Sequence, residues 1–311
     1  MNKILITGGG GYLGTKLTSL LLQKSYDVTV FDDLIFGGDH LLKFTNIKNF
    51  NFIKGDIRKV DDIKKINTSK FQVIVHLASI VGYPACRANP ILAKETNING
   101  TENILKFKKK NQLIIFASTG SNYGSKKEVV NENSKLEPLS LYAESKVINE
   151  NMIKKTENFI IYRFATAFGS SPRMRLDLLV NDFLFKAVTE GYLVVYEKDH
   201  KRSFIHVDDI ANSILFAIKN SNKMKNEVFN VGDESMNFSK KEICDKIKKK
   251  IKKLYIHYAE VDKDMDQRNY IVSYKKIKKV GFKTKISIDE GLDELLKSIP
   301  LLKKNKNYSN V

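Results

Sequence analysis

The chain has 311 residues, and 42% of them are hydrophobic, which is enough apolar material for one large domain or two interlocked domains. Its 53 lysine and arginine residues against 35 aspartate and glutamate residues give a formal net charge of +18. Because the lysines stand in short runs on helix-like segments that carry Ile and Leu at core spacing, they indicate solvated helix faces and not a nucleic-acid surface.

The hydrophobic residues are not arranged for a membrane or for secretion. The apolar run near the N-terminus is only Ile4 to Ile6, and no later run approaches the ~18 residues of a membrane span. Two cysteines, Cys86 and Cys244, make neither a disulfide framework nor a zinc site. We therefore expect a cytoplasmic globular protein with no metal site and no membrane partner.

Strand-like and helix-like segments alternate through the first half of the chain. Strands are predicted at residues 3–7, 27–33, 50–56, 72–78, 112–118 and 159–165, and helices at 12–24, 60–66, 93–109 and 142–156. Continuous apolar strands separated by helices predict an α/β protein with a doubly wound parallel sheet. From about Ala167 the pattern changes to longer loops and Lys-rich helices, so a second region is expected to pack directly on the first.

The glycine-rich segment after the first strand predicts a dinucleotide site. Gly8, Gly11 and Gly14 form G-x-x-G-x-x-G between a strand and a helix, and Tyr12 and Leu13 complete the loop. Such a loop brings backbone N–H groups and the positive end of the helix dipole up to a pyrophosphate, where a side chain would obstruct the approach. A merely structural turn is the alternative.

An acidic residue at the end of the second predicted strand specifies the cofactor. The carboxylate of Asp32 can accept both ribose hydroxyls of NAD, and it would repel the 2′-phosphate of NADP. The sequence therefore predicts that the bound dinucleotide is NAD.

A possible proton-transfer group lies further along the chain in "LYAESK". Tyr142 and Lys146 are four residues apart on a predicted helix and share a face. A phenol is a poor base at neutral pH, but an adjacent ammonium and a nicotinamide cation both favour phenolate. The preceding strand ends in "FASTGSNYG", where the hydroxyls of Ser118 and Thr119 can orient a substrate alcohol. The alternative is an exposed Tyr and Lys on a solvated helix.

These residues give the chain a resemblance to the extended short-chain dehydrogenase/reductase family, in its nucleotide-sugar epimerase/dehydratase branch. The motifs "TGGGGYLG", "FDDL", "GDIR", "HLAS", "STGSNYG", "YAESK" and "RSFIHVDDIA" appear in the family's order and cover almost all of the chain. The resemblance implies that Thr119, Tyr142 and Lys146 form the catalytic group, with Lys146 also binding the cofactor.

The same resemblance implies a division into two parts. Residues 1–166, with 204–232 returning to them, would form a Rossmann-type NAD-binding domain, and residues 167–203 and 233–311 a smaller C-terminal α/β substrate-binding lobe. Asp56 and Ile57 would border the adenine, and Ala78 would lie along the cofactor. In the lobe, Arg202 and Arg268 would grip the nucleotide diphosphate. A homodimer through the helices at 93–109 and 142–156 is implied as well.

Two stretches resemble narrower parts of the family. "SPRMRLDLLVNDF" (171–183) is similar to a sub-branch of bacterial enzymes of surface-polysaccharide synthesis that includes GDP-heptose 4-dehydrogenases, and it places Asn181 near the substrate. Arg173 and Arg175 in this stretch could reach a phosphate or form a salt bridge within the loop. "VGYPACRANP" (81–90) falls where the family lines the sugar pocket, and we interpret Cys86 there as a packing residue.

Departures from the family's motifs restrict the reaction. Thr119 is followed by Gly120 and Ser121, where the 4,6-dehydratases carry Asp-Glu and the decarboxylating relatives carry a Glu. Thr166 replaces the Asn of many 4-epimerases, which weakens any transfer of UDP-hexose specificity. NAD-dependent oxidation at C4 of a GDP- or UDP-linked sugar remains, with either a 4-epimerase or a 4-dehydrogenase outcome. A non-catalytic NAD(P)- or RNA-binding protein on the same fold is the alternative.

Overall fold

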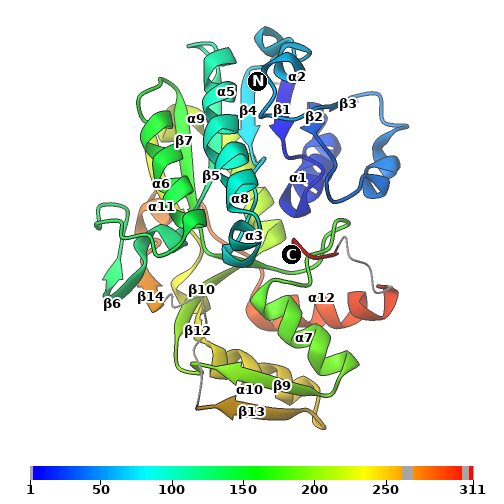
Figure 1. The fold of residues 1–311 in the computed structure, drawn as a ribbon, viewed down its shortest axis with the longest axis vertical. Coiled ribbons are helices and arrows are strands. Elements are labelled where there is room, and N and C mark those ends of the chain that lie inside the picture. The colour runs from blue at the N-terminus through cyan, green and yellow to red at the C-terminus, as the bar shows by residue number, and fades with distance from the viewer. Residues whose placement is uncertain (1–2, 261–268, 303–307, 311) are drawn as a thin grey trace.

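A parallel sheet organises the larger part of the chain (Figure 1). The structure, a computed structural model, describes residues 3–260, 269–302 and 308–310. The sheet has seven strands in the order β11-β7-β5-β4-β1-β2-β3, and every neighbouring pair is parallel. The strands are β1 (Lys3–Thr7), β2 (Asp27–Asp32), β3 (Phe50–Lys54), β4 (Val73–His76), β5 (Leu113–Thr119), β7 (Phe159–Phe164) and β11 (Glu227–Val231). The predicted doubly wound, Rossmann-type sheet is confirmed, and its strand order reverses between β1 and β4.

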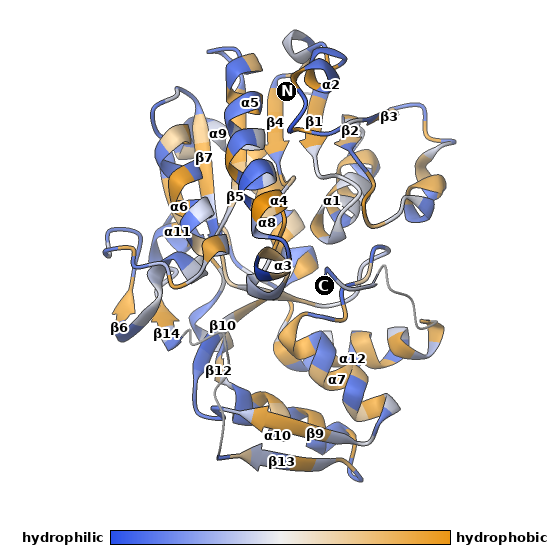
Figure 2. Cartoon of the chain, in the orientation of Figure 1, coloured by the Kyte–Doolittle hydropathy of each residue, from blue (hydrophilic) through white to orange (hydrophobic). Residues whose placement is uncertain are grey.

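Helices cover both faces of this sheet because its strands are apolar on both sides. Along β1, Ile4 and Ile6 face a core shared with α1 (Tyr12–Gln23) and α8 (Val207–Lys219), whereas Leu5 faces a core shared with α2 (Val60–Lys64), α5 (Gly100–Phe107) and α6 (Leu141–Ile153). Figure 2 shows β1, β4 and β7 as mostly hydrophobic, with hydrophilic residues on the outer sides of α5 and α6.

The remaining elements are shorter or belong to the lower part of the molecule in Figure 1. Three small sheets pair β12 (Asn237–Ser239) with β10 (Lys201–His206) and β8 (Thr166–Phe168), β13 (Tyr255–Ala259) with β9 (Tyr192–Tyr196), and β14 (Asn269–Val272) with β6 (Ser125–Val130). The other α-helices are α3 (Tyr83–Ala88), α4 (Pro90–Lys94), α7 (Leu179–Thr189), α9 (Ser221–Met224), α10 (Lys240–Lys250), α11 (Lys275–Lys279) and α12 (Ile288–Ser298). Short helical turns are η1 (Asp39–Phe44), η2 (Thr68–Lys70), η3 (Glu95–Asn99), η4 (Gly120–Tyr123), η5 (Glu234–Met236) and η6 (Ile299–Leu301). A second core unites α7, α10 and α12 with β9.

The helix predicted at 93–109 contains an irregularity that its sequence pattern does not indicate. It consists of α4, a π-helical turn η3, and α5. The wider turn contains the buried Asn97, whose side-chain oxygen accepts hydrogen bonds from Ser79 Oγ at 2.9 Å and from the Ile80 N–H at 2.7 Å. Its amide nitrogen donates to Ile80 O and to Ser145 Oγ. The turn therefore joins the segment after β4 to α6.

Direct hydrogen bonds join the lower part of the molecule to α1. Tyr12 Oη donates to Gly169 O at 2.7 Å, and Ser171 Oγ donates to Tyr12 O at 2.7 Å. Gly169 has a φ of +108°, and a Cβ there would lie 2.2 Å from the His206 ring, so only glycine fits this crossing. The segment that leaves β8 is thus fixed to the start of α1.

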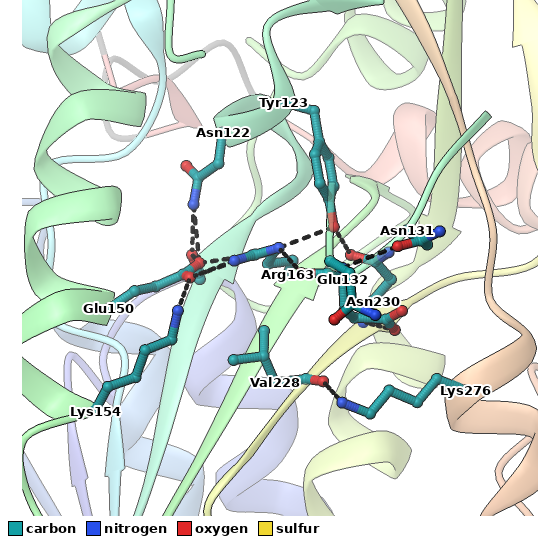
Figure 3. Close-up of polar contacts among 12 residues, drawn as sticks. Asn122, Tyr123, Asn131, Glu132, Glu150, Lys154, Arg163, Val228, Asn230 and Lys276 are labelled. Carbon is teal, nitrogen blue, oxygen red and sulfur yellow. Dashed lines mark hydrogen bonds and ion pairs between the residues drawn. The ribbon is translucent and has the colours of Figure 1, made fainter. Parts of the chain in front are cut away.

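A buried ion pair attaches α6 to the sheet (Figure 3). Glu150 on α6 and Arg163 on β7 are 1% and 3% exposed, and Arg163 Nη2 lies 2.7 Å from Glu150 Oε2. Ser118 Oγ and Asn122 Nδ2 donate to Glu150 Oε1 at 2.6 and 2.9 Å, while Arg163 Nη1 donates to Tyr123 Oη at 3.0 Å. Burial alone would raise the pKa of Glu150, but its hydrogen bonds with Arg163 hold that pKa below the usual value.

Replacement of Glu150 tests this attachment. Glu150→Gln leaves the buried guanidinium of Arg163 without its counter-charge, so we expect the free energy of unfolding to fall by about 3–5 kcal/mol. Urea unfolding followed by circular dichroism measures it. Glu144→Gln, on an exposed position of the same helix, is the control and should change it by less than about 0.5 kcal/mol. Equal losses in both variants would contradict the argument.

Two glycines with similar backbone angles allow a second test. Gly8 and Gly191 have φ values of +73° and +77°, but a Cβ on Gly8 would lie 2.5 Å from the backbone nitrogen of Ala78, whereas one on Gly191 would meet nothing within 4 Å. Gly191→Ala should cost only the backbone strain of about 1–2 kcal/mol. Gly8→Ala adds a collision with the backbone at Ala78, just after β4. The free energy of unfolding of this variant should therefore fall by roughly 1–3 kcal/mol more than that of Gly191→Ala. A loss no larger than that of Gly191→Ala would show that the loop moves freely.

Candidate functional site

A cavity of about 290 Å³ lies at the carboxyl ends of the sheet strands, around the point where the strand order reverses. The segment after β8 forms another wall of it. Most of the site residues predicted from the sequence line this cavity: Gly8, Gly11, Tyr12, Leu13, Gly14, Asp32, Asp56, Ile57, Ala78, Thr119, Tyr142, Lys146, Arg173 and Arg175. Folding thus brings together residues that are far apart in the sequence.

The glycine loop has the close packing that a pyrophosphate site requires. A Cβ on Gly14 would lie 2.4 Å from Gly8 O, so the first turn of α1 approaches the end of β1 without any intervening side chain. Gly11 precedes α1, and no side chain caps the first N–H groups of that helix. These donors and the helix dipole suit a bound phosphate.

Asp32, Asp33 and Asp56 line the cavity near the glycine loop, and the sequence assigned a role to Asp32 and Asp56. Asp32 Oδ2 accepts a hydrogen bond from the Gly10 N–H at 2.9 Å, and its Oδ1 accepts one from the Leu34 N–H at 2.8 Å. Burial raises the pKa of Asp32. The two backbone bonds orient a carboxylate whose remaining lone pairs can accept ribose hydroxyls, and this geometry fits NAD.

Asp56 differs from Asp32 because its carboxylate is paired. Arg58 Nη2 lies 2.6 Å from Asp56 Oδ2, and Arg58 Nε donates to the same carboxylate. Burial would raise the pKa of Asp56, but the hydrogen bonds with Arg58 hold it below the usual value. Its neighbour Ile57 is buried and lines the cavity beside it.

Lys146 and Tyr142 line the cavity from α6, as their spacing predicts. Lys146 is buried, its Nζ donates to Ala117 O at 2.9 Å, and it lies 5.8 Å from the centroid of the Tyr142 ring. Burial lowers the pKa of Lys146 to about 8. At neutral pH an ammonium group therefore remains beside the phenol.

The hydroxyls at the end of β5 divide into two groups. Thr119 lines the cavity, and its Oγ1 lies 3.0 Å from Ser121 Oγ and accepts a hydrogen bond from the Ser121 N–H. Ser118 lines the cavity too, but its hydroxyl donates to Glu150 and so also bonds the buried ion pair. Ser121 also lines the cavity, although the sequence singled it out only for standing where the 4,6-dehydratases carry an acidic residue. Its position two residues after Thr119, at the start of η4, is the signal that could have found it.

The residues predicted to bind substrate are placed in different surroundings. Arg175 lines the cavity and forms an ion pair with Asp177, as the alternative of a salt bridge within the loop predicts. Asn181 is fully buried, and its amide bonds the backbone of Gly169 and Arg175, which holds the loop in place. Arg202 is buried on β10 and does not line the described cavity. Arg268 lies outside the described residues.

Cys86 and a cluster of His206, Asp208 and Glu294 also carry groups that can react or bind metal. Cys86 Sγ donates to Ile80 O at 3.3 Å, and burial raises the pKa of its thiol to about 11, which suits a packing residue. Among the described residues, His206, Asp208 and Glu294 could together hold a metal ion. Lys16 Nζ already lies 2.9 Å from Asp208, however, and supplies a positive charge there. No helix in the described ranges is long and apolar enough to cross a membrane.

Comparison with known proteins agrees with this geometry. A putative UDP-glucose 4-epimerase of Methanocaldococcus jannaschii is 29% identical over 310 residues, which cover 94% of this chain and 97% of the relative. The CDP-paratose 2-epimerase of Salmonella typhi is 27% identical over 338 residues, covering 94% and 98%. The crystal structure of UDP-glucuronic acid 4-epimerase from Bacillus cereus, in complex with UDP-glucuronic acid and NAD, has the same fold, with a TM-score of 0.84 at 23% identity over 97% of this chain and 100% of that one.

The family itself is shown by a match that spans the sheet and the cavity. The NAD dependent epimerase/dehydratase family model matches residues 4–232, from β1 to the end of β11. This range contains the glycine loop, Asp32 and the Tyr142–Lys146 pair. The chain therefore belongs to the NAD-dependent epimerase/dehydratase family and is an NAD-dependent enzyme.

Proposed function

We propose that this enzyme oxidises a GDP- or UDP-linked sugar at C4 and forms a 4-keto species. One observation carries the proposal: Thr119, Tyr142 and Lys146 line the same cavity as the glycine loop and Asp32. The names of its relatives, a UDP-glucose 4-epimerase, a CDP-paratose 2-epimerase and a UDP-glucuronate 4-epimerase, support a nucleotide sugar as the substrate.

Each of the three side chains has a distinct role in this proposal. Tyr142, as phenolate, takes the proton of the C4 hydroxyl, and the nearby ammonium of Lys146 stabilises that phenolate. The Thr119 hydroxyl shares the alcohol proton and positions it, while its bond with the Ser121 N–H fixes its own orientation. Lys146 also binds the nicotinamide ribose. When NAD is bound, it supplies the acceptor for the C4 hydride.

The turn after β5 argues against dehydration as the next step. Gly120 and Ser121 stand where a 4,6-dehydratase needs an acid and a base. A Cβ on Gly120 would lie 3.3 Å from Tyr270 Oη and 3.5 Å from Phe164 O, so even a small side chain is tightly confined at this position. The 4-keto species is left with two fates. It can recover hydride on its other face, as in a 4-epimerase, or leave, as in a 4-dehydrogenase.

Two further features of the proposal come from the resemblance. The stretch at 171–183 favours bacterial surface-polysaccharide synthesis and tilts the outcome toward release of the keto sugar. The homodimer would form through the helices predicted at 93–109 and 142–156. Ile91, on the α4 turn that leads into the first of these, and Ile148, on α6, are 70% and 42% exposed. Large exposed apolar side chains on both segments support that interface.

The substrate and the outcome can be determined in one experiment. The enzyme is incubated with a panel of GDP- and UDP-sugars in deuterated water, and the products are followed by NMR. A C4-inverted sugar identifies an epimerase, and a 4-keto product with stoichiometric NADH identifies a dehydrogenase. If no nucleotide sugar changes under these conditions, the proposal is wrong.

The role of Tyr142 is tested by removing one oxygen. Tyr142→Phe should lower turnover by at least about 100-fold, because an acid/base group is lost, while the affinity for NAD stays nearly unchanged. Tyr192→Phe, on an exposed tyrosine of β9, is the matched control and should retain full turnover. Retained turnover in Tyr142→Phe would show that another group is the base, and Thr119 would be examined first.

A further inference from the structure

Arg173 is carried to the cofactor half of the cavity by the segment that follows β8. Ser171 Oγ donates to Tyr12 O, and the Tyr12 hydroxyl donates to Gly169 O, so this segment crosses the first turn of α1. Arg173 comes two residues after Ser171 and lines the cavity. An arginine of the C-terminal half of the chain thus stands beside the glycine loop.

Arg173 contacts Phe36, which follows β2, and Ser309 near the C-terminus. Its guanidinium carbon lies 4.2 Å from the ring centroid of Phe36, a cavity residue that follows Asp32 after β2. Arg173 Nη2 donates to Ser309 O at 3.3 Å. The buried Nε has no hydrogen-bond partner among residues 3–260, 269–302 and 308–310. The stacking on Phe36 holds the plane of the guanidinium, and one of its donors remains for a ligand.

Arg173 forms no ion pair with a carboxylate of the described residues, although Asp177 and Asp32 attract its charge from a distance. Burial lowers the pKa of Arg173 to about 10, so the group is protonated at neutral pH although it is only 3% exposed. The nearest carboxylates have other partners: Asp32 accepts from the backbone N–H groups of Gly10 and Leu34, and Asp177 pairs with Arg175. A buried cation with an unfilled donor is costly unless an anion joins it.

We propose that Arg173 binds the diphosphate of NAD, reaching the cofactor from the segment that leads into the substrate lobe. The N-terminus of α1 and Asp32 mark where a pyrophosphate and an adenosine ribose would lie, and Arg173 is near both. This assignment replaces the sequence-based expectation that Arg173 holds a phosphate of the substrate. It rests on NAD dependence and is independent of the sugar chemistry proposed above.

The comparison of adenosine with ADP tests the assignment, because these two ligands differ only in the diphosphate. Adenosine, ADP and NAD are titrated calorimetrically into the full chain and into Arg173→Gln. The variant should bind ADP and NAD about 10- to 100-fold more weakly, through the loss of charge-assisted hydrogen bonds, and adenosine within about twofold of the unchanged protein. Lys219→Gln, on an exposed lysine at the end of α8, is the charge control and should bind all three as before. Arg173→Lys keeps the charge and should recover part of the ADP affinity.

The other results would overturn the proposal. Unchanged ADP binding in Arg173→Gln would exclude a contact with the cofactor diphosphate. If Arg173→Gln and Arg173→Lys both lost the same affinity for adenosine as for ADP, Arg173 would maintain the shape of the site and would not contact phosphate. Weaker GDP or UDP binding with normal ADP binding would return Arg173 to the substrate. Because none of these titrations involves turnover, failure here leaves the C4 oxidation to be judged separately by its own products.

Discussion

The buried pair of Glu150 and Arg163 is the interaction on which the geometry of the site depends. Glu150 lies one helical turn after Lys146 and two turns after Tyr142, and the carboxylate that holds it to β7 also holds the ends of β5 and η4 through Ser118 and Asn122. The helix that bears Tyr142 and Lys146 and the strand end that bears Thr119 are therefore both held by one carboxylate. Their separation cannot change without breaking a fully buried ion pair, so the site is preorganised before any ligand binds.

A second constraint acts at the glycine loop. Gly8 and Gly14 approach each other and the segment after β4 so closely that no side chain is tolerated at either position. The same approach leaves the N–H groups at the start of α1 open toward the cavity. The two constraints lie on neighbouring parts of one sheet edge, which is why the glycine loop and the Tyr142–Lys146 pair line one cavity.

The sheet and its helices could be predicted because they depend on local patterns. Apolar runs such as residues 112–118 and the helical spacing at 142–156 carry the whole signal for β5 and α6, and their bounds differ from the structure by a few residues. The π-helical turn at Asn97 could not be predicted, because it depends on hydrogen bonds to Ile80 and Ser145. Such partners are distant in sequence and leave no periodic trace.

The same difference between local patterns and long-range contacts explains which parts of the site could be predicted. Tyr142 and Lys146 share a helix, so their placement on one face follows from their spacing. Ser118 and Thr119 are adjacent at the end of β5 and both line the cavity, but the Ser118 hydroxyl donates to Glu150, and that long-range bond could not be predicted from the sequence. The surroundings of Arg173 depend on Phe36, more than a hundred residues earlier, and required the tertiary structure.

The crossing of Tyr12 with Gly169 and Ser171 has a consequence for how the molecule comes apart. The residue that opens α1 is bonded on its side chain and on its backbone to the segment that leads into the lower core. Lys16, one turn later, is bonded to Asp208 of α8. If either core unfolds, the first turns of α1 lose hydrogen-bond or ion-pair partners. The sheet with its helices and the lower core should therefore unfold in a single cooperative transition, with no separately folded half.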